Sequence, residues 1–326
     1  RLAVRGTDAD RGMKKRLGEL ALTASSLAAC VLVIEFVVCR TLLVPDGLLE
    51  KVTINEVVRS KPGSRATCRH PDGASSSVVA NAQCWNSLVS SYERARAGGV
   101  QRIAIVGDSH VHGAFVDRDD HFAARLNTFL ADRGAKAEVY RFGMDGAPLS
   151  QHVHMLRREV LSYKPDVVVI PVIHNDFDES YRFLKTRYAS SFMKLERLEG
   201  TDTVRAIPPT PFQPGLADIL RRSTAFRYAY YETGLYLRLK DVVSRYFWGG
   251  QEMFDPAFIS SAVDVRKIRD HDANRFFARY ALGELQKMSR THGFKLLFVM
   301  DGVRGAIYAM EPRAQWEVSK LNEIAG

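Results

Sequence analysis

The segment Ile103–His110 constrains the fold of this chain more than any other. It reads Ile-Ala-Ile-Val-Gly-Asp-Ser-His, a short β-branched strand that ends at Gly107 and is followed by Ser109 where a helix is expected to begin. Glycine allows a sharp turn, and ligands bind at the carboxyl ends of parallel strands. A serine there has an exposed hydroxyl beside a helix N-terminus, as an ester-attacking nucleophile requires. An Asp-Ser pair is also a good helix cap, so this segment alone leaves both interpretations open.

Strands and helices alternate over most of the chain after residue 100. Runs of Val, Ile and Leu predict strands, and apolar residues at helical spacing predict helices between them. Asp119 and Asp120 are expected to cap the first of these helices, which runs to about residue 133. The expected strands are 102–106, 137–141, 166–173 and 294–301, and the later helices 149–161, 270–292 and 312–324. This alternation is typical of an α/β fold in which helices flank a parallel sheet.

Two further segments follow the next two expected strands. Arg141–Ala147 reads Arg-Phe-Gly-Met-Asp-Gly-Ala, and Ile173–Asp176 reads Ile-His-Asn-Asp. The order Gly-Asp-Ser, strand-end glycine and Asn-Asp resembles the SGNH (GDSL-type) hydrolase superfamily. The resemblance runs from about residue 101 to residue 305 and is interrupted by a long middle segment. It departs from the family pattern at Ile173, where the third block usually has glycine.

The resemblance implies a three-layer, flavodoxin-like α/β fold and an ester hydrolase without a cofactor or a metal. Ser109 would be the nucleophile, and the backbone N–H groups of Ser109 and Gly146 and the side chain of Asn175 would form the oxyanion hole. The physical logic is that donors from three neighbouring strand ends converge where a tetrahedral oxyanion forms. We expect Asp108 to brace the nucleophile turn and Asp176 to support the Asn175 loop.

The general base of the family is missing from its expected place. The last family block is Asp-x-x-His, in which the histidine deprotonates the serine and the aspartate orients the histidine. This pattern occurs nowhere in the 326 residues. We therefore expect the catalytic His and Asp in a segment beyond Gly326. Because losing the histidine of a serine hydrolase costs roughly 10⁶ in turnover, the chain as given is expected to be nearly inactive.

No histidine in the chain has the sequence context of a replacement base. His110 adjoins the nucleophile, but adjacent helix residues point in different directions. His112 has better spacing and no evident carboxylate partner. His174 adjoins the predicted oxyanion residue, and His271 is expected in a surface loop. Three more histidines are expected on helix surfaces: His121, His152 and His154.

An apolar segment near the N-terminus, Leu17–Cys39, is long enough to cross a bilayer as one helix. Its acidic residues, Glu19 and Glu35, lie near its two ends. Six basic residues against two acidic ones among residues 1–16 predict a cytoplasmic N-terminus. A cleaved signal peptide, a lipoprotein signal at Cys30 and a buried soluble helix are the alternatives, and the length of the apolar run favours a single-span anchor.

The anchor places the rest of the chain outside the cytoplasm. Cys68 and Cys84 flank a Pro/Gly/Ser-rich stretch there, and in an oxidising compartment such a pair predicts a disulfide. The expected parts are a basic tail (1–16), the anchor (17–39), a loop-rich juxtamembrane region (40–100) and a C-terminally incomplete hydrolase-like domain (101–326) with an insertion at about 181–265.

The insertion is expected to lack strands and to hold an aromatic-rich helical part at about 216–247. Aromatic rings stack on sugars, but they also pack small cores, and both interpretations stay open. The formal net charge of +9 is not clustered into a nucleic-acid stripe, and no Gly-rich phosphate loop occurs. No nucleic acid is therefore expected as a partner.

These features predict a serine esterase of the bacterial inner membrane, with its catalytic domain in the periplasm. The predicted substrates are O-acyl esters, in particular acetyl esters, of a carbohydrate or envelope polysaccharide, and this substrate class rests on the resemblance and the location. Two alternatives remain: an O-acyltransferase that uses the same acyl-enzyme, and a non-catalytic SGNH-like module for polysaccharide binding or export.

Overall fold

The computed structural model describes residues 6–43, 47, 49–69, 75–173, 176, 180–181, 189–233 and 272–300. The chain divides into two compact units, of which the smaller comprises residues 1–46 and 214–253 and the larger residues 47–213 and 254–326. The expected helix 312–324 and the part of the expected helix 216–247 after residue 233 lie outside the described residues.

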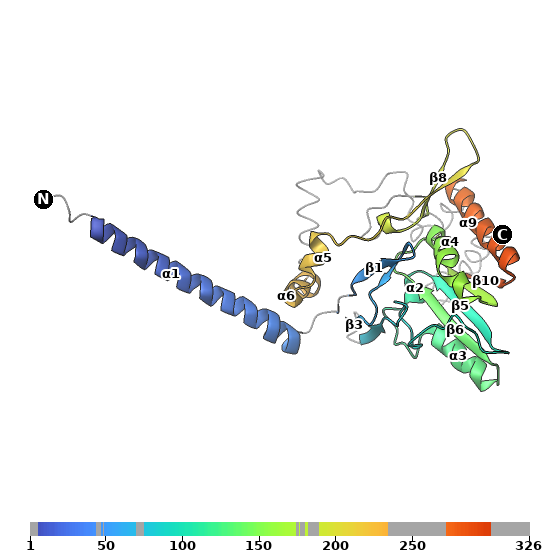
Figure 1. Ribbon diagram of the computed structural model, residues 1–326, viewed down its shortest axis with the longest axis horizontal. Helices are drawn as coiled ribbons and strands as arrows, with labels where there is room; N and C mark the ends of the chain where they lie inside the picture. Colours follow the sequence, from blue (N-terminus) through green and yellow to red (C-terminus); the bar gives the residue numbers. More distant parts are fainter. Residues whose placement is uncertain are drawn as a thin grey trace, which may run out of the picture. The chain divides into compact units, whose positions relative to one another are not determined.

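The larger unit is built on a parallel sheet of four described strands. They are β5 (Gln101–Gly107), β6 (Ala137–Gly143), β7 (Val167–Val172) and β10 (Lys295–Met300), in the order β10-β7-β5-β6. Each pairing between them is parallel, and Ile103 lies opposite both Val139 and Val167. The α/β fold with a parallel sheet flanked by helices is thus confirmed (Figure 1).

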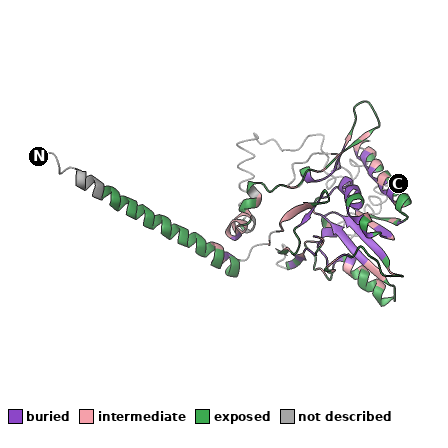
Figure 2. Ribbon diagram, viewed as in Figure 1, coloured by how far each residue is buried: buried purple, intermediate pink, exposed green. Residues whose placement is uncertain are grey.

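Helices cover both faces of this sheet. The helices are α3 (Phe122–Asp132) on one face and α4 (Leu149–Arg158) and α9 (Asp272–His292) on the other. Successive side chains of a strand point to opposite faces, so Ile103 and Ile105 pack toward α3 whereas Ala104 and Val106 join the larger core under α4 and α9. β5, β6 and β7 are accordingly largely buried, whereas β10 is mostly exposed (Figure 2).

The helix ends differ in part from the expectation. α3 is capped by His121, whose ring Nδ1 accepts from the Ala123 amide at 3.1 Å, so the expected caps Asp119 and Asp120 are wrong. An imidazole nitrogen replaces the usual carboxylate or hydroxyl acceptor at this cap. α4 ends at Arg158, and a 3-10 turn, η2 (Val160–Tyr163), continues the expected helix.

Antiparallel hairpins flank the sheet in sequence. They are β1 (Lys51–Ile54) with β2 (Val57–Ser60), β3 (Arg65–Arg69) with β4 (Ser75–Val79), and β8 (Lys194–Arg197) with β9 (Val204–Ile207), which follows the 3-10 turn η4 (Ala189–Ser191). The last hairpin lies in the insertion, so the expectation of an insertion without strands is wrong.

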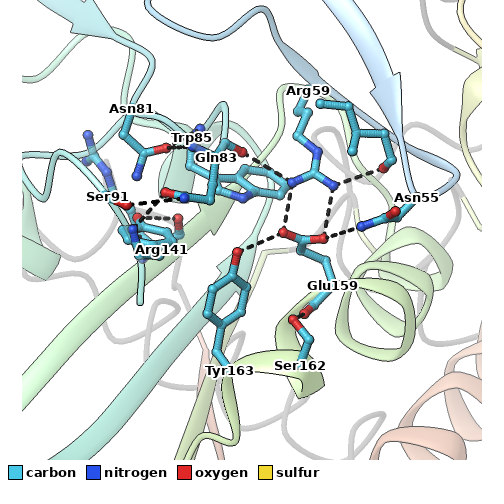
Figure 3. Close-up of polar contacts among 12 residues, drawn as sticks. Asn55, Arg59, Asn81, Gln83, Trp85, Ser91, Arg141, Glu159, Ser162 and Tyr163 are labelled. Atoms are coloured by element: carbon cyan, nitrogen blue, oxygen red, sulfur yellow. Dashed lines mark hydrogen bonds and ion pairs between the residues drawn. The ribbon is translucent and has the colours of Figure 1, made fainter. Parts of the chain in front are cut away.

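A buried ion pair joins the first hairpin to the sheet layer (Figure 3). Arg59 on β2 and Glu159 after α4 are 2% and 3% exposed and form two parallel bonds, Nη1–Oε1 at 2.9 Å and Nη2–Oε2 at 3.0 Å. Asn55 and Tyr163 donate to the same carboxylate at 3.1 and 3.0 Å, and the guanidinium lies 5.0 Å from the Trp85 ring. Burial raises the pKa of Glu159, but these donors outweigh it and hold the pKa below its ordinary value.

The predicted disulfide is wrong, because no bond joins Cys68 to Cys84. Cys68 lies on β3 opposite Ser76, whereas Cys84 lies in a turn beyond Ala80, at the other end of the hairpin. Ala80 lies four residues along the chain from Ser76, which is roughly 13 Å in an extended strand. A disulfide needs Cα atoms within about 7 Å, so the hairpin register keeps the two thiols apart.

The smaller unit contains the long apolar helix. α1 (Gly6–Val33) continues into the π-helix η1 (Ile34–Leu42), and residues 12–42 are long and apolar enough to cross a membrane. Its apolar side chains are exposed (Figure 2). The same unit holds α5 (Leu216–Leu220), α6 (Thr224–Arg227) and the π-turn η5 (Tyr228–Glu232), and α6 packs against η1.

Candidate functional site

The nucleophile candidate lies on the turn from β5 into the short helix α2 (Ser109–His112). Gly107 permits this turn to pack closely, because a Cβ there would lie 2.4 Å from Cγ2 of Val111. Asp108 is the N-cap of α2 and accepts from the His110 amide at 2.9 Å. Ser109 is exposed at the start of the helix. The strand, glycine turn and helix start therefore lie where the sequence predicted them.

Asp108 also contacts the nucleophile candidate, Ser109, directly. The Ser109 hydroxyl donates to its carboxylate at 3.3 Å, and Nδ1 of His110 lies 3.3 Å from it. Asp108 is 3% exposed. Burial raises its pKa, but hydrogen bonds from the His110 side chain and amide outweigh burial, so the pKa lies below its ordinary value. An ionised Asp108 thus braces the turn from inside.

The end of β6 forms a tight turn beside the nucleophile helix. A Cβ at Gly143 would lie 2.2 Å from the backbone nitrogen of His112, so only glycine lets α2 lie this close to β6. The next turn closes with the Ala147 amide donating to the Met144 carbonyl at 3.1 Å. Gly146, at its third position, is exposed and has φ +69°, the value that favours glycine there.

An aspartate in this turn pairs with a histidine of the nucleophile helix. Oδ1 of Asp145 lies 3.0 Å from Nδ1 of His112, which is 2% exposed, while the Asp145 side chain is 40% exposed. Burial raises the pKa of Asp145, but His112 and Lys51 outweigh it and keep the pKa below its ordinary value. The expectation that His112 has no carboxylate partner is therefore wrong. Its ring ties α2 to the Gly146 turn.

The end of β7 supplies the third edge of the site. Asp176 is fully buried, and its Oδ2 accepts from the Ile173 amide at 3.0 Å while its own amide donates to the Ile173 carbonyl at 3.0 Å. These two bonds hold Asp176 against the end of β7. Asn175 and His174 themselves lie outside the described residues.

One cavity of about 1190 Å³ connects these three strand ends. Ser109 and His110 line it from β5, Asp145 from β6, and Pro171 and Ile173 from β7. The remaining lining residues are mostly apolar and come from the sheet, α3 and the loop before it: Ile105, Gly113, Ala114, Phe115, Val116, Asp120, His121, Phe122, Leu126, Val169, Val299 and Met300. Gly146 lies next to the lining residue Asp145 in sequence. The cavity combines an exposed hydroxyl with a mostly apolar wall, as small-molecule sites do.

Three histidines that were expected on helix surfaces are buried, so that expectation is wrong. His121, His152 and His154 are 2%, 0% and 4% exposed. The His121 ring bonds to the His110 carbonyl at 3.0 Å, in addition to capping α3. Burial lowers the pKa of both His121 and His152 to about 4. Both imidazoles are therefore neutral at pH 7 and serve as packed polar groups.

No group of three His, Cys, Asp or Glu side chains within the part of the chain that the structure describes is placed to hold a metal ion. The polar side chains that line the cavity are one hydroxyl, carboxylates and imidazoles.

No family model matches the chain, and no curated protein matches its sequence. Solved structures to which it is similar include AlinE4, an SGNH-hydrolase family esterase, at 23% identity over 29% of this chain, with a TM-score of 0.23. A point mutant of that esterase matches at 15% identity over 62% of this chain and 77% of its own, with a TM-score of 0.26. TesA matches at 14% identity over 59% of this chain and 99% of its own, with a TM-score of 0.24. The chain spans about half (52%) of the length of AlinE4 in the first of these matches.

Proposed function

We propose that the protein is a membrane-anchored serine esterase in which Ser109 attacks the acyl carbonyl of an O-acyl ester. The observation that carries this proposal is the exposed Ser109, which shares one cavity with the carboxyl ends of β6 and β7. A nucleophile, oxyanion donors and space for an ester must meet in such a cavity.

The reaction proceeds through an acyl-enzyme. Oγ of Ser109 bonds to the acyl carbon, its proton passes to a base, and the carbonyl oxygen becomes an oxyanion. The N–H groups of Ser109 and Gly146 and the Asn175 carboxamide are assigned as donors to that oxyanion. The tetrahedral intermediate then breaks its ester C–O bond, and the base protonates the leaving alcohol. Water attacks the acylated serine with help from the same base and releases the acid.

The base is assigned to a histidine outside the described residues. In the resting site, the Ser109 hydroxyl donates to Asp108 and must rotate toward that base before it attacks. Buried His112 is paired with Asp145, and both ring nitrogens of His121 are engaged by backbone groups. Asp108 therefore orients the nucleophile rather than deprotonating it.

The proposed substrates are O-acyl esters, in particular acetyl esters, of an envelope carbohydrate. A cavity of about 1190 Å³ has room for an ester with its sugar and not only for an acetyl group. We propose that the apolar helix crosses the inner membrane with its N-terminus in the cytoplasm and the sheet unit in the periplasm. The excess of basic residues ahead of the helix supports this orientation.

Labelling with a fluorophosphonate tests the nucleophile. The protein, expressed from its complete reading frame, is treated with the probe, digested and analysed by mass spectrometry, with a known serine esterase as the positive control. We expect one adduct on Ser109, none in Ser109→Ala, and unchanged labelling in Ser77→Ala, which alters an exposed serine on β4. An unlabelled Ser109 beside a labelled control esterase would refute the assignment.

A further inference from the structure

One carboxylate of the apolar helix binds the turn between α5 and α6. Glu35 accepts hydrogen bonds from the amides of Thr224 and Ala225 at 2.8 and 2.9 Å and from the Ser223 hydroxyl at 2.8 Å. The Glu35 side chain is 15% exposed, and Arg40 lies 3.7 Å from the same carboxylate. The first N–H groups of α6 thus have an acceptor that belongs to the helix proposed to span the membrane.

This contact sets the depth of the α5–α6 segment relative to the span. An acidic residue in a membrane helix is costly and needs a partner, and the α6 amides provide it. Glu35 precedes Cys39, the last residue of the expected span, by four residues, which is about 6 Å of helix. The bound turn therefore lies close to the level of the lipid headgroups.

α5 carries an exposed apolar stripe next to this turn. Leu216, Ile219 and Leu220 have the i, i+3, i+4 spacing of one helix face, and they are 73%, 52% and 43% exposed. The charged residue Arg221 is turned inward, where it pairs with Asp218 at 3.2 Å. A helix that faces water exposes its charged residues and buries its apolar ones. A helix in the membrane interface instead has apolar residues on its lipid side.

We propose that residues 215–232 form an interfacial element that lies in the outer headgroup layer of the bilayer spanned by α1 and η1. Leu216, Ile219 and Leu220 enter the boundary with the acyl chains, so the partner of this surface is the lipid itself. Phe226 and Tyr230, stacked at 5.5 Å, add the aromatic side chains that favour this layer. The inference rests on the membrane span proposed above.

Quenching by brominated lipids tests the element. An environment-sensitive fluorescent amino acid replaces Ile219, Leu27 in the middle of the apolar helix, or Phe129 on α3, and each full chain is reconstituted in phosphatidylcholine and phosphatidylglycerol vesicles. We expect bromines near the headgroup to quench position 219 more strongly than bromines deep in the acyl chains do, as for an interfacial helix, and the reverse order at position 27. Position 129 is the reference outside the smaller unit.

The outcomes separate the two proposals. Quenching at position 27 without quenching at position 219 leaves the span standing and overturns the interfacial element. An unquenched position 27 overturns the span itself. Glu35→Ala is expected to reduce quenching at position 219 at least severalfold while position 27 is unchanged, and Glu35→Gln, which keeps one acceptor, to reduce it less. Glu19→Ala, near the other end of the helix, is the matched control. If Glu35→Ala leaves position 219 as quenched as before, Glu35 does not hold the element.

Discussion

Asp108 controls the resting state of the site, because its carboxylate accepts from both the His110 amide and the Ser109 hydroxyl. The serine proton is thus held by a group whose lowered pKa makes it a weak base. The cost of turning the hydroxyl away is one hydrogen bond to a charged group, roughly 1.5–3 kcal/mol. Asp108 therefore orients the Ser109 hydroxyl at rest, and in the proposed mechanism Ser109 is activated only when a stronger base is in place.

Asp145→Asn tests whether the pair with His112 positions the Gly146 turn. The substitution removes the charge that faces the buried imidazole, so we expect the turn to loosen and the rate of fluorophosphonate labelling of Ser109 to fall roughly tenfold. Asp120→Asn, a more exposed carboxylate that also lines the cavity, is the control and should label normally. Equal rates in both variants would show that the pair has no role at the site, and circular dichroism would separate this effect from unfolding.

Glu159→Gln tests the buried ion pair shown in Figure 3. Removing one charge leaves Arg59 buried without its counterion, so we expect the free energy of unfolding to fall by about 3–5 kcal/mol. Urea unfolding in detergent, followed by Trp fluorescence, measures this loss. Glu196→Gln breaks a surface pair with Arg205 and should change the free energy by less than about 0.5 kcal/mol. Similar small effects from both substitutions would contradict the proposed importance of burial.

The buried histidines predict acid sensitivity. Burial lowers the pKa of His121 and His152 to about 4, against about 6.5 in an unfolded chain. Between these pH values the unfolded chain binds more protons than the folded chain. The contribution of the two histidines to the free energy of unfolding is therefore fully present above pH 6.5 and is lost as the pH falls toward 4. Each histidine contributes a slope of up to about 1.4 kcal/mol per pH unit. His152→Gln should reduce the slope measured by urea unfolding at a series of pH values, and a flat profile in the parent chain would contradict the prediction.

Single residues at the site were predictable from sequence where one local motif determines them. Ser109 and Asp108 follow from a strand, a glycine and a helix start that are contiguous in the chain. The pairing of His112 with Asp145 was missed because it depends on how closely Gly143 lets α2 approach β6. The burial of His152 was also missed, since helical spacing alone does not reveal which face packs on the sheet.

At the scale of elements, the parallel sheet was predictable and the hairpins were not. β5, β7 and β10 are runs of branched apolar residues, a strong strand signal. The turn between β1 and β2 uses Asn55 and Glu56 at φ 52° and 62°, where Asn-Gly is the usual signature. Hairpin β8–β9 has a charged strand, KLER, that carries little β-propensity. Tertiary contacts, rather than local pattern, select these strands.

Gly143→Ala tests the contact between α2 and β6. The new Cβ would lie 2.2 Å from the His112 backbone nitrogen, so the helix that carries Ser109 must shift. We expect a loss of roughly 1–3 kcal/mol in unfolding free energy and slower labelling of Ser109. Gly283→Ala on α9 has open space around its Cβ and should stabilise the helix by about 0.5–1 kcal/mol. A Gly143→Ala protein with full stability would contradict the close packing.

At the scale of the molecule, the chain combines an apolar helix with a sheet unit that has its own core. The larger unit begins at Gly47, and its core residues come from the sheet, α4, α9 and the first hairpin. The long apolar helix was predictable because its length and apolarity can be read directly from the sequence. The grouping of residues 214–253 with the N-terminal segment was not, since the contact through Glu35 joins residues far apart in sequence.

A chain that begins at Gly47 tests this organisation. Without the apolar helix, we expect it to lose resistance to alkaline carbonate extraction, which the full chain should retain in isolated membranes. Its far-ultraviolet circular dichroism and a cooperative thermal transition should show that the sheet unit still folds. Extraction of the full chain by carbonate would contradict the anchor, and a truncated chain without a transition would contradict an independent core.

The strand order has a consequence for biosynthesis. β7 ends at Val172, whereas its outer neighbour β10 begins only at Lys295. Until the ribosome has passed Met300, the nascent chain therefore presents one edge of β7 with unpaired amides and carbonyls, a template for wrong pairing. At the usual rate of translation this interval lasts on the order of ten seconds. Holdase chaperones or slow codons would act on the chain within this window.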